Sequence, residues 1–186
     1  MTRTCTIING HLHSPFFLFL RASGRLADID LLRLLGLHNF VGCPLRVDHN
    51  APHLYLTEDE AWIHIADDLR YSLWHKGAFN IADALHKALP AAPLFACSVG
   101  DVDRSFQFAY YLSGLMTRLY VVDDRPGNRG DRIVIADDGE PLPGEMALGF
   151  IEDEQEYVLS LAAGLGVRLD HHLDQIRCYT KPPSQT

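Results

Sequence analysis

Short runs of alternating apolar and polar positions, typical of β-strands, recur along most of the chain. They occupy Thr4–Ile8, Phe16–Arg21, Leu45–Asp48, Leu54–Leu56, Ala61–Ala66, Leu94–Ser98, Ser105–Leu112, Leu115–Val122, Arg132–Ala136 and Gln175–Tyr179. Because side chains alternate between the faces of a strand, Ile63 and Ile65 are expected to share one face. Trp62 and His64 are then expected on the opposite face. Tyr71–Trp74 is expected to extend this strand or to pair with it.

The clearest local pattern is a predicted β-hairpin in the second half of the chain. Ser113-Gly114 separates two strand-like segments and has the composition of a two-residue turn. Phe106, Phe108 and Tyr110 on the first of these strands would then share one face. This pattern predicts antiparallel pairing.

Three segments have the spacing of amphipathic helices. Leu26–Leu35 is followed by Gly36, which is typical of a helix C-terminus. Asn80–Leu89 starts with a capping-box-like sequence and stops before Pro90. Glu152–Leu165 has an acidic first turn, which suits the positive end of the helix dipole.

Strands and helices do not alternate strictly, so a parallel, doubly wound sheet is disfavoured. We therefore expect an α+β fold, with a mainly antiparallel sheet and two or three helices packed on one side. No linker rich in proline, glycine or serine divides the chain. Residues 1–180 are expected to form a single domain, and residues 181–186 a flexible C-terminal tail.

The charge balance is acidic. The chain of 186 residues has 24 acidic and 16 basic side chains, and its formal net charge is −8. Such a chain repels phosphate backbones, which argues against nucleic-acid binding. It attracts a basic protein partner and accelerates association with it, although the same charge also maintains solubility.

The four cysteines, Cys5, Cys43, Cys97 and Cys178, are far apart and form no C-x-x-C pair. They are expected to be buried thiols in a reducing compartment. The apolar run Pro15–Leu20 is far shorter than the about 20 residues needed to span a bilayer, and no clear cleavage site follows it. We therefore expect a cytoplasmic protein without a membrane segment.

The chain contains no complete catalytic motif: no nucleophile elbow, P-loop, H-E-x-x-H or dinucleotide fingerprint. Asp101 and Asp103, in the segment Gly100–Ser105, could offer oxygen ligands to a divalent cation. The further acidic positions of a calcium loop are missing, so a turn in which Asp side chains bond nearby backbone amides is favoured. We accordingly expect no catalytic residue, no metal and no cofactor.

Two histidine pairs leave a second function open. His11 and His13 would point the same way on a strand, and His171-His172 form another pair. Zinc needs three or four ligands brought together in space, and a linear sequence does not show whether these residues meet. A small metal-dependent hydrolase, built from these histidines and the two aspartates of the preceding segment, is therefore the alternative function.

Acidic residues gather where strands are predicted to end. These residues are Asp67, Asp68, Asp101, Asp103, Asp123, Asp124, Asp137, Asp138 and Glu140. If several of these strand ends share one edge of the sheet, they form an acidic rim. Tyr71, Trp74 and Arg104 would lie beside it, and together they would suit the binding of a basic protein. Otherwise the charges simply solvate separate loops.

The runs Trp62–Trp74, Ser98–Phe106 and Gly139–Glu145 resemble those of small bacterial immunity-type proteins, which are cognate to secreted toxins. The resemblance covers the middle and later parts of the chain. It implies a cytoplasmic, protein-binding inhibitor that neutralises a basic toxin domain by occluding its active site. It carries no catalytic residue, so we do not expect an enzyme. A housekeeping or structural subunit without a specific ligand is the third interpretation.

Overall fold

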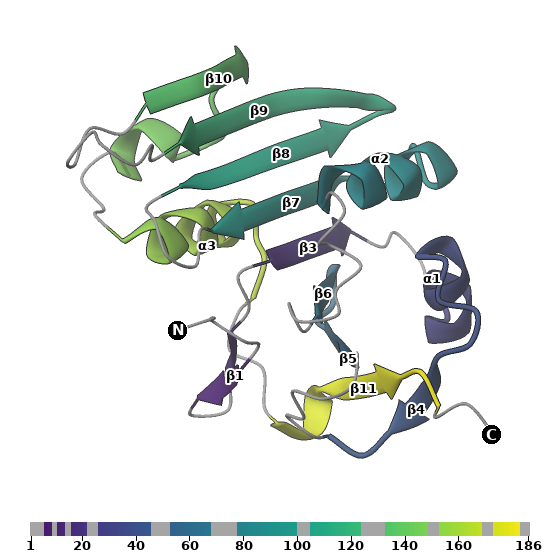
Figure 1. The fold of residues 1–186 in the computed structure, drawn as a ribbon. Helices are drawn as coiled ribbons and strands as arrows, with labels where there is room; N and C mark the ends of the chain where they lie inside the picture. Colours follow the sequence, from purple (N-terminus) through teal and green to yellow (C-terminus); the bar gives the residue numbers. More distant parts are fainter. Residues whose placement is uncertain are drawn as a thin grey trace.

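The computed structural model describes residues 6–8, 11–13, 16–21, 26–45, 53–67, 78–99, 105–123, 133–148, 153–168 and 173–182. Within these ranges a nine-stranded antiparallel sheet, in the order β10-β9-β8-β7-β3-β6-β5-β11-β4, forms the centre of the molecule (Figure 1). Its strands are β3 (Phe16–Arg21), β4 (Val41–Cys43), β5 (His53–Glu58), β6 (Trp62–Asp67), β7 (Leu94–Val99), β8 (Phe106–Leu112), β9 (Leu115–Asp123), β10 (Ile133–Gly139) and β11 (Arg177–Thr180). A separate two-stranded ribbon pairs β1 (Thr6–Ile8) with β2 (His11–His13).

Each face of the sheet has its own helices. Phe17 and Phe19 of β3 belong to a buried cluster that also contains residues of α3 (Glu154–Gly164). Leu18 and Leu20 of the same strand belong to a second cluster, on the opposite face. That cluster contains residues of α1 (Asp28–Leu34) and α2 (Ala78–Ala88).

The expected class, an α+β fold with a mainly antiparallel sheet, is confirmed. The helices α1 and α2 lie on one side of the sheet, as expected for two of the helices (Figure 1). The third helix, α3, covers the opposite face. Its apolar residues, such as Val158 and Leu161, meet the aromatic side chains that β3, β7 and β8 present there.

The alternation predicted for β6 is also confirmed. Trp62 lies in the cluster below α3, whereas Ile63 and Ile65 lie in the cluster below α1 and α2. His64 shares the face of Trp62, because its ring centroid lies 5.2 Å from that of Phe17 and 4.5 Å from a second phenylalanine of β3. His64 is thus a core residue surrounded by aromatic rings.

Local signals placed the hairpin and α3 correctly, whereas the helix start predicted at Asn80 is wrong, because α2 begins at Ala78. Ser113 and Gly114 connect β8 to β9 with φ values of 50° and 85°, the left-handed conformation that a tight hairpin turn requires. The first turn of α3 is capped by Asp153, whose carboxylate accepts a hydrogen bond of 2.8 Å from the backbone N–H of Glu156. The phenol of Tyr111 on β8 donates to Asp83 of α2 at 2.7 Å, which ties that helix to the sheet.

Several element boundaries differ from the sequence-based expectation. The predicted strand Leu45–Asp48 is wrong at its start, because the strand of this region, β4, ends at Cys43. The polar region expected to be a turn between the first two strands contains β2, which pairs with β1. Tyr71–Trp74 lies outside the described residues. No helix within the described ranges is long and apolar enough to cross a membrane.

Candidate functional site

Three strands that lead into the predicted acidic segments end at one edge of the sheet. β6, β7 and β9 occupy alternate positions in an antiparallel sheet, so they run in the same direction. They end at Asp67, Val99 and Asp123. We refer to the edge defined by these three residues as the acidic edge, because two aspartates follow or end each of these strands in the sequence.

The acidic edge is wide enough to meet a folded partner. β6 and β9 are separated by β3, β7 and β8, which makes four interstrand steps. At about 4.8 Å per step, the two strand ends lie about 19 Å apart along the sheet. A standard protein interface covers about 800 Å² on each partner, so a single patch of that size can contain this edge.

Most of the predicted binding residues follow these strands directly but are not themselves described. Asp67 and Asp123 are placed by their strands, and Asp123 is partly exposed. The predicted residues outside the described ranges are Asp68, Tyr71, Trp74, Asp101, Asp103, Arg104 and Asp124. Their part in a binding surface therefore stays a prediction.

The last predicted group lies at the other end of the sheet. β10 runs antiparallel to β9, and Asp123 pairs with Ile133, the first residue of β10. Asp137 and Asp138 come late in β10, and Glu140 follows its last residue. Among the described residues, the acidic strand ends therefore divide into two groups at opposite edges of the sheet.

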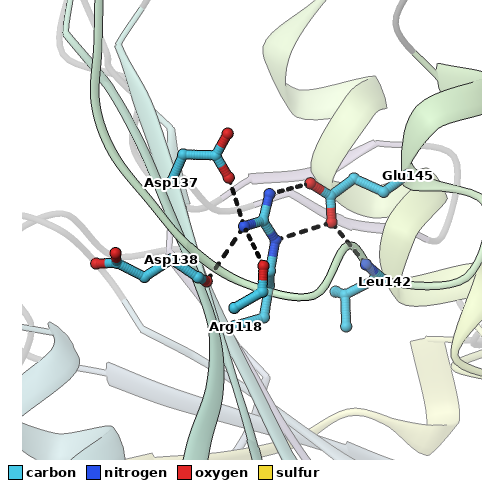
Figure 2. Close-up of polar contacts among 6 residues, drawn as sticks. Arg118, Asp137, Asp138, Leu142 and Glu145 are labelled. Carbon is cyan, nitrogen blue, oxygen red and sulfur yellow. Dashed lines mark hydrogen bonds and ion pairs between the residues drawn. The ribbon is translucent and has the colours of Figure 1, made fainter.

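At this opposite edge the chain uses one of the predicted carboxylates internally (Figure 2). Arg118 of β9 donates through Nε to Glu145 at 3.1 Å, and through Nη2 to the second oxygen of the same carboxylate. Its Nη1 donates to Asp137 at 2.6 Å and to the next two backbone carbonyls, at 3.1 and 3.3 Å. The backbone N–H of Leu142 donates to Glu145 at 2.7 Å. These contacts hold the loop after β10 against the sheet.

The surroundings of Arg118 favour a permanently charged guanidinium. Its hydrogen bonds to Glu145 raise the pKa of Arg118 above its usual value, and they outweigh the opposing effect of burial. The guanidinium also lies over the rings of Tyr120 and Phe108, 5.3 and 5.9 Å from their centroids. Burial, followed by the negative charge of Glu145, raises the pKa of the neighbouring Tyr157 to about 12. We interpret this cluster as an anchor for the loop, because its charged groups are already engaged by one another.

A similar cluster joins α1 to the C-terminal strand. Arg177 of β11 donates to both carboxylate oxygens of Asp28, at 2.6 and 3.0 Å, and to Glu58 at 3.3 Å. The phenol of Tyr179 donates to the same Asp28 carboxylate. Burial, followed by this hydrogen bond, raises the pKa of Tyr179 to about 12. The carboxylate at the start of α1 is therefore used to dock the helix.

One group of potential metal ligands comes together among the residues that the structure describes. A nitrogen of His53 and the sulfur atoms of Cys43 and Cys178 all lie within 4.8 Å of one another. The cysteines are far apart in the sequence and were not predicted to form such a group. Its three members come from β5, β4 and β11, so no local spacing reveals it. Of the thiols, Cys178 and Cys97 are buried, whereas Cys43 is half-buried.

The histidines considered for a hydrolase are a different set. His11 and His13 are the first and last residues of β2. His171, His172 and the aspartates of segment 100–105 lie outside the described residues. The metal-dependent hydrolase therefore stays a prediction that these contacts neither support nor oppose.

The chain was compared with models of protein families, with curated proteins and with solved structures, and none of the three comparisons found a match.

Proposed function

We propose that this protein binds a basic protein domain through its acidic edge and inhibits it, in the manner of an immunity protein that neutralises a cognate toxin. The observation that carries the proposal is the common direction of β6, β7 and β9, which end at Asp67, Val99 and Asp123. Acidic segments that are dispersed along the sequence thus leave the sheet at one edge.

The sequence after each of these strand ends repeats one charge pattern. Two acids are followed closely by an arginine in Asp67-Asp68-Leu69-Arg70, in Asp101-Val102-Asp103-Arg104 and in Asp123-Asp124-Arg125. Each segment therefore has two carboxylates and one guanidinium. A partner that matches this pattern would be mainly basic, and it would place hydrogen-bond acceptors opposite the arginines. Patterned charges of this kind favour selective pairing over general attraction.

The net charge of −8 supports the same choice of partner. A toxin that acts on nucleic acids needs a basic substrate surface, and an acidic protein placed over that surface would exclude the substrate. Inhibition by occlusion requires no catalytic residue in the inhibitor. The charge clusters of Arg118 and Arg177, which are internal to the fold, would help to keep the scaffold of the sheet rigid.

The experiment is co-expression with the product of the adjacent gene in the source genome. We expect that product to be toxic alone and harmless together with this chain, and the two purified proteins to form a stoichiometric complex. An adjacent product that is not toxic, or that shows no complex with this chain, would contradict the proposal.

Matched variants locate the binding edge. The double variant Asp67→Asn/Asp123→Asn removes two charges at the acidic edge, whereas Asp138→Asn/Glu140→Gln removes two at the opposite edge. We expect the first to slow association about tenfold at 0.1 M salt and the second to have little effect, because screening limits charge steering to roughly 10 Å at this salt concentration. Equal effects of the two variants would place the binding surface elsewhere.

A further inference from the structure

Cys43 and Cys178 are direct neighbours across two strands that are distant in the sequence. They face each other in the antiparallel pairing of β4 with β11, and their sulfur atoms lie 3.2 Å apart. Because directly opposed residues of such a pair point to the same side of the sheet, this contact follows from the strand register.

His53 lies near the same two thiols, on the strand at the other side of β11. It starts β5 and pairs with Thr180, two positions beyond Cys178 on β11. Positions two apart on a strand share a face, so the imidazole of His53 and the thiol of Cys178 lie on one side of the sheet. His53 and Cys178 are buried, and Cys43 is half-buried.

From this arrangement we infer that Cys43, His53 and Cys178 bind a zinc ion. Two thiolates and one imidazole form a soft sulfur–nitrogen donor set, which suits zinc and does not suit calcium or magnesium. In tetrahedral coordination with Zn–S near 2.3 Å, two sulfurs lie about 3.8 Å apart, and sulfur and nitrogen about 3.6 Å apart. The ligand atoms here lie within 4.8 Å of one another, so small side-chain rotations bring them to those distances. Water, or a residue other than these three, completes the fourth position.

The proposed zinc ion would hold β4, at one margin of the sheet, to its neighbouring strands. β4 has three residues, and among the described strands it lies at the margin of the sheet and pairs with β11 alone. Cys43 and Cys178 are 135 positions apart in the sequence, so forming this contact costs chain entropy. The short pairing of β4 with β11 offsets only part of this cost. A metal bound to β4, β5 and β11 together would hold the C-terminal strand between its two neighbours. Binding and folding would then be coupled.

Cys97 provides a contrast within the same protein. It lies in the central strand β7, and burial raises the pKa of its thiol well above the usual range. It is not one of the three clustered ligands. It therefore serves as the control cysteine in a test of metal binding.

The test measures the metal content of the full chain purified without chelator, by mass spectrometry of the element, and then binding of cobalt(II) as a spectroscopic substitute. We expect about one zinc per chain, and a cobalt form with thiolate charge-transfer absorption and the intense visible bands of a tetrahedral site. Cys43→Ser and His53→Ala should each reduce metal content and cobalt absorption at least tenfold. Cys97→Ala should retain both.

Two outcomes would overturn the inference. The first is a wild-type chain that contains no zinc as purified and gives no tetrahedral cobalt spectrum on titration. The second is peptide mapping without reductant that finds Cys43 joined to Cys178 in the cytoplasmically expressed protein, since a disulfide would occupy both sulfurs. Cys43 is half-buried, so Cys43→Ser should keep the fold, and its circular dichroism spectrum checks this point.

Discussion

Arg118 and Glu145 form a two-pronged ion pair inside the protein, with side-chain exposures of 2% and 7%. Arg118 belongs to a regular strand, whereas Glu145 starts the short 3-10 helix η3 (Glu145–Leu148) after the loop that follows β10. The pair thus connects the sheet to the segment that follows β10. Buried charges of this kind are stable only as long as each keeps its partner.

Replacement of Glu145 by glutamine should therefore destabilise the protein strongly. Glu145→Gln leaves a buried guanidinium with only Asp137 as a charged partner, and the expected loss is about 3 kcal/mol of unfolding free energy. Urea denaturation checks this value. Asp137→Asn is the control: its side chain is 60% exposed, so it should cost about 1 kcal/mol or less.

The same pair predicts non-additive mutations. Arg118→Met in a Glu145→Gln background removes the charge that was left uncompensated. The double variant should therefore be less destabilised than the sum of the two single variants, by about 1–3 kcal/mol. If the two losses of unfolding free energy were strictly additive, the two side chains would contribute to stability independently of each other.

Gly139 should resist substitution far more than Gly144. Both have positive φ, 87° and 85°, so alanine at either position costs about 1–2 kcal/mol of backbone strain. At Gly139 a Cβ would also lie 2.0 Å from the carbonyl oxygen of Thr117, whereas at Gly144 nothing lies within 4 Å. Gly139→Ala should therefore cost about 2–5 kcal/mol in all, against about 1–2 kcal/mol for Gly144→Ala. Similar thermal midpoints for the two variants would contradict this prediction.

Stability should fall at alkaline pH, and Tyr157 and Tyr179 should contribute to this loss. The pKa values of Tyr179 and Tyr157 are raised to about 12 in the folded chain, first by burial and then by nearby carboxylates. Folded-state values above the usual value of about 10 mean that the folded chain binds these protons more tightly than the unfolded chain. Their stabilisation is complete below pH 10, and it is lost as the pH rises from about 10 to about 12.

Urea denaturation at a series of pH values measures this loss. Tyr179→Phe removes one of the titrating groups, so its stability should decline less steeply between pH 10 and 12 than that of the wild type. Parallel curves for the two proteins would show that Tyr179 does not contribute to the alkaline transition.

The salt concentration should change the rate of association with the proposed basic partner more than the rate of dissociation. Asp123 at the acidic edge is partly exposed, so solvent and ions screen its charge within roughly 10 Å at 0.1 M salt. Raising the salt concentration should slow association, with a much smaller change in dissociation. Surface plasmon resonance at several salt concentrations separates the two rates. A complex whose association is insensitive to salt would not use this edge.

Local patterns in the sequence determined most of the elements. The turn at Ser113-Gly114 could be predicted because its positive φ values suit only a few residue types, and α3 because its acidic first turn and apolar stripe coincide. The opposite faces of Trp62 and Ile63 followed from strand periodicity alone. β4 was missed because Val41-Gly42-Cys43 has no alternation, and it becomes a strand only through its pairing with β11.

Only the tertiary structure decided which of these elements are neighbours. The sequence indicated acids at strand ends, but the order of the sheet placed Asp67 and Asp123 at one edge and Asp137 at the other. It also brought Cys43 and Cys178 together across 135 positions. The physical reason is that a strand specifies its two faces through its own residues, whereas its partner and register depend on which apolar faces pack together across the whole chain.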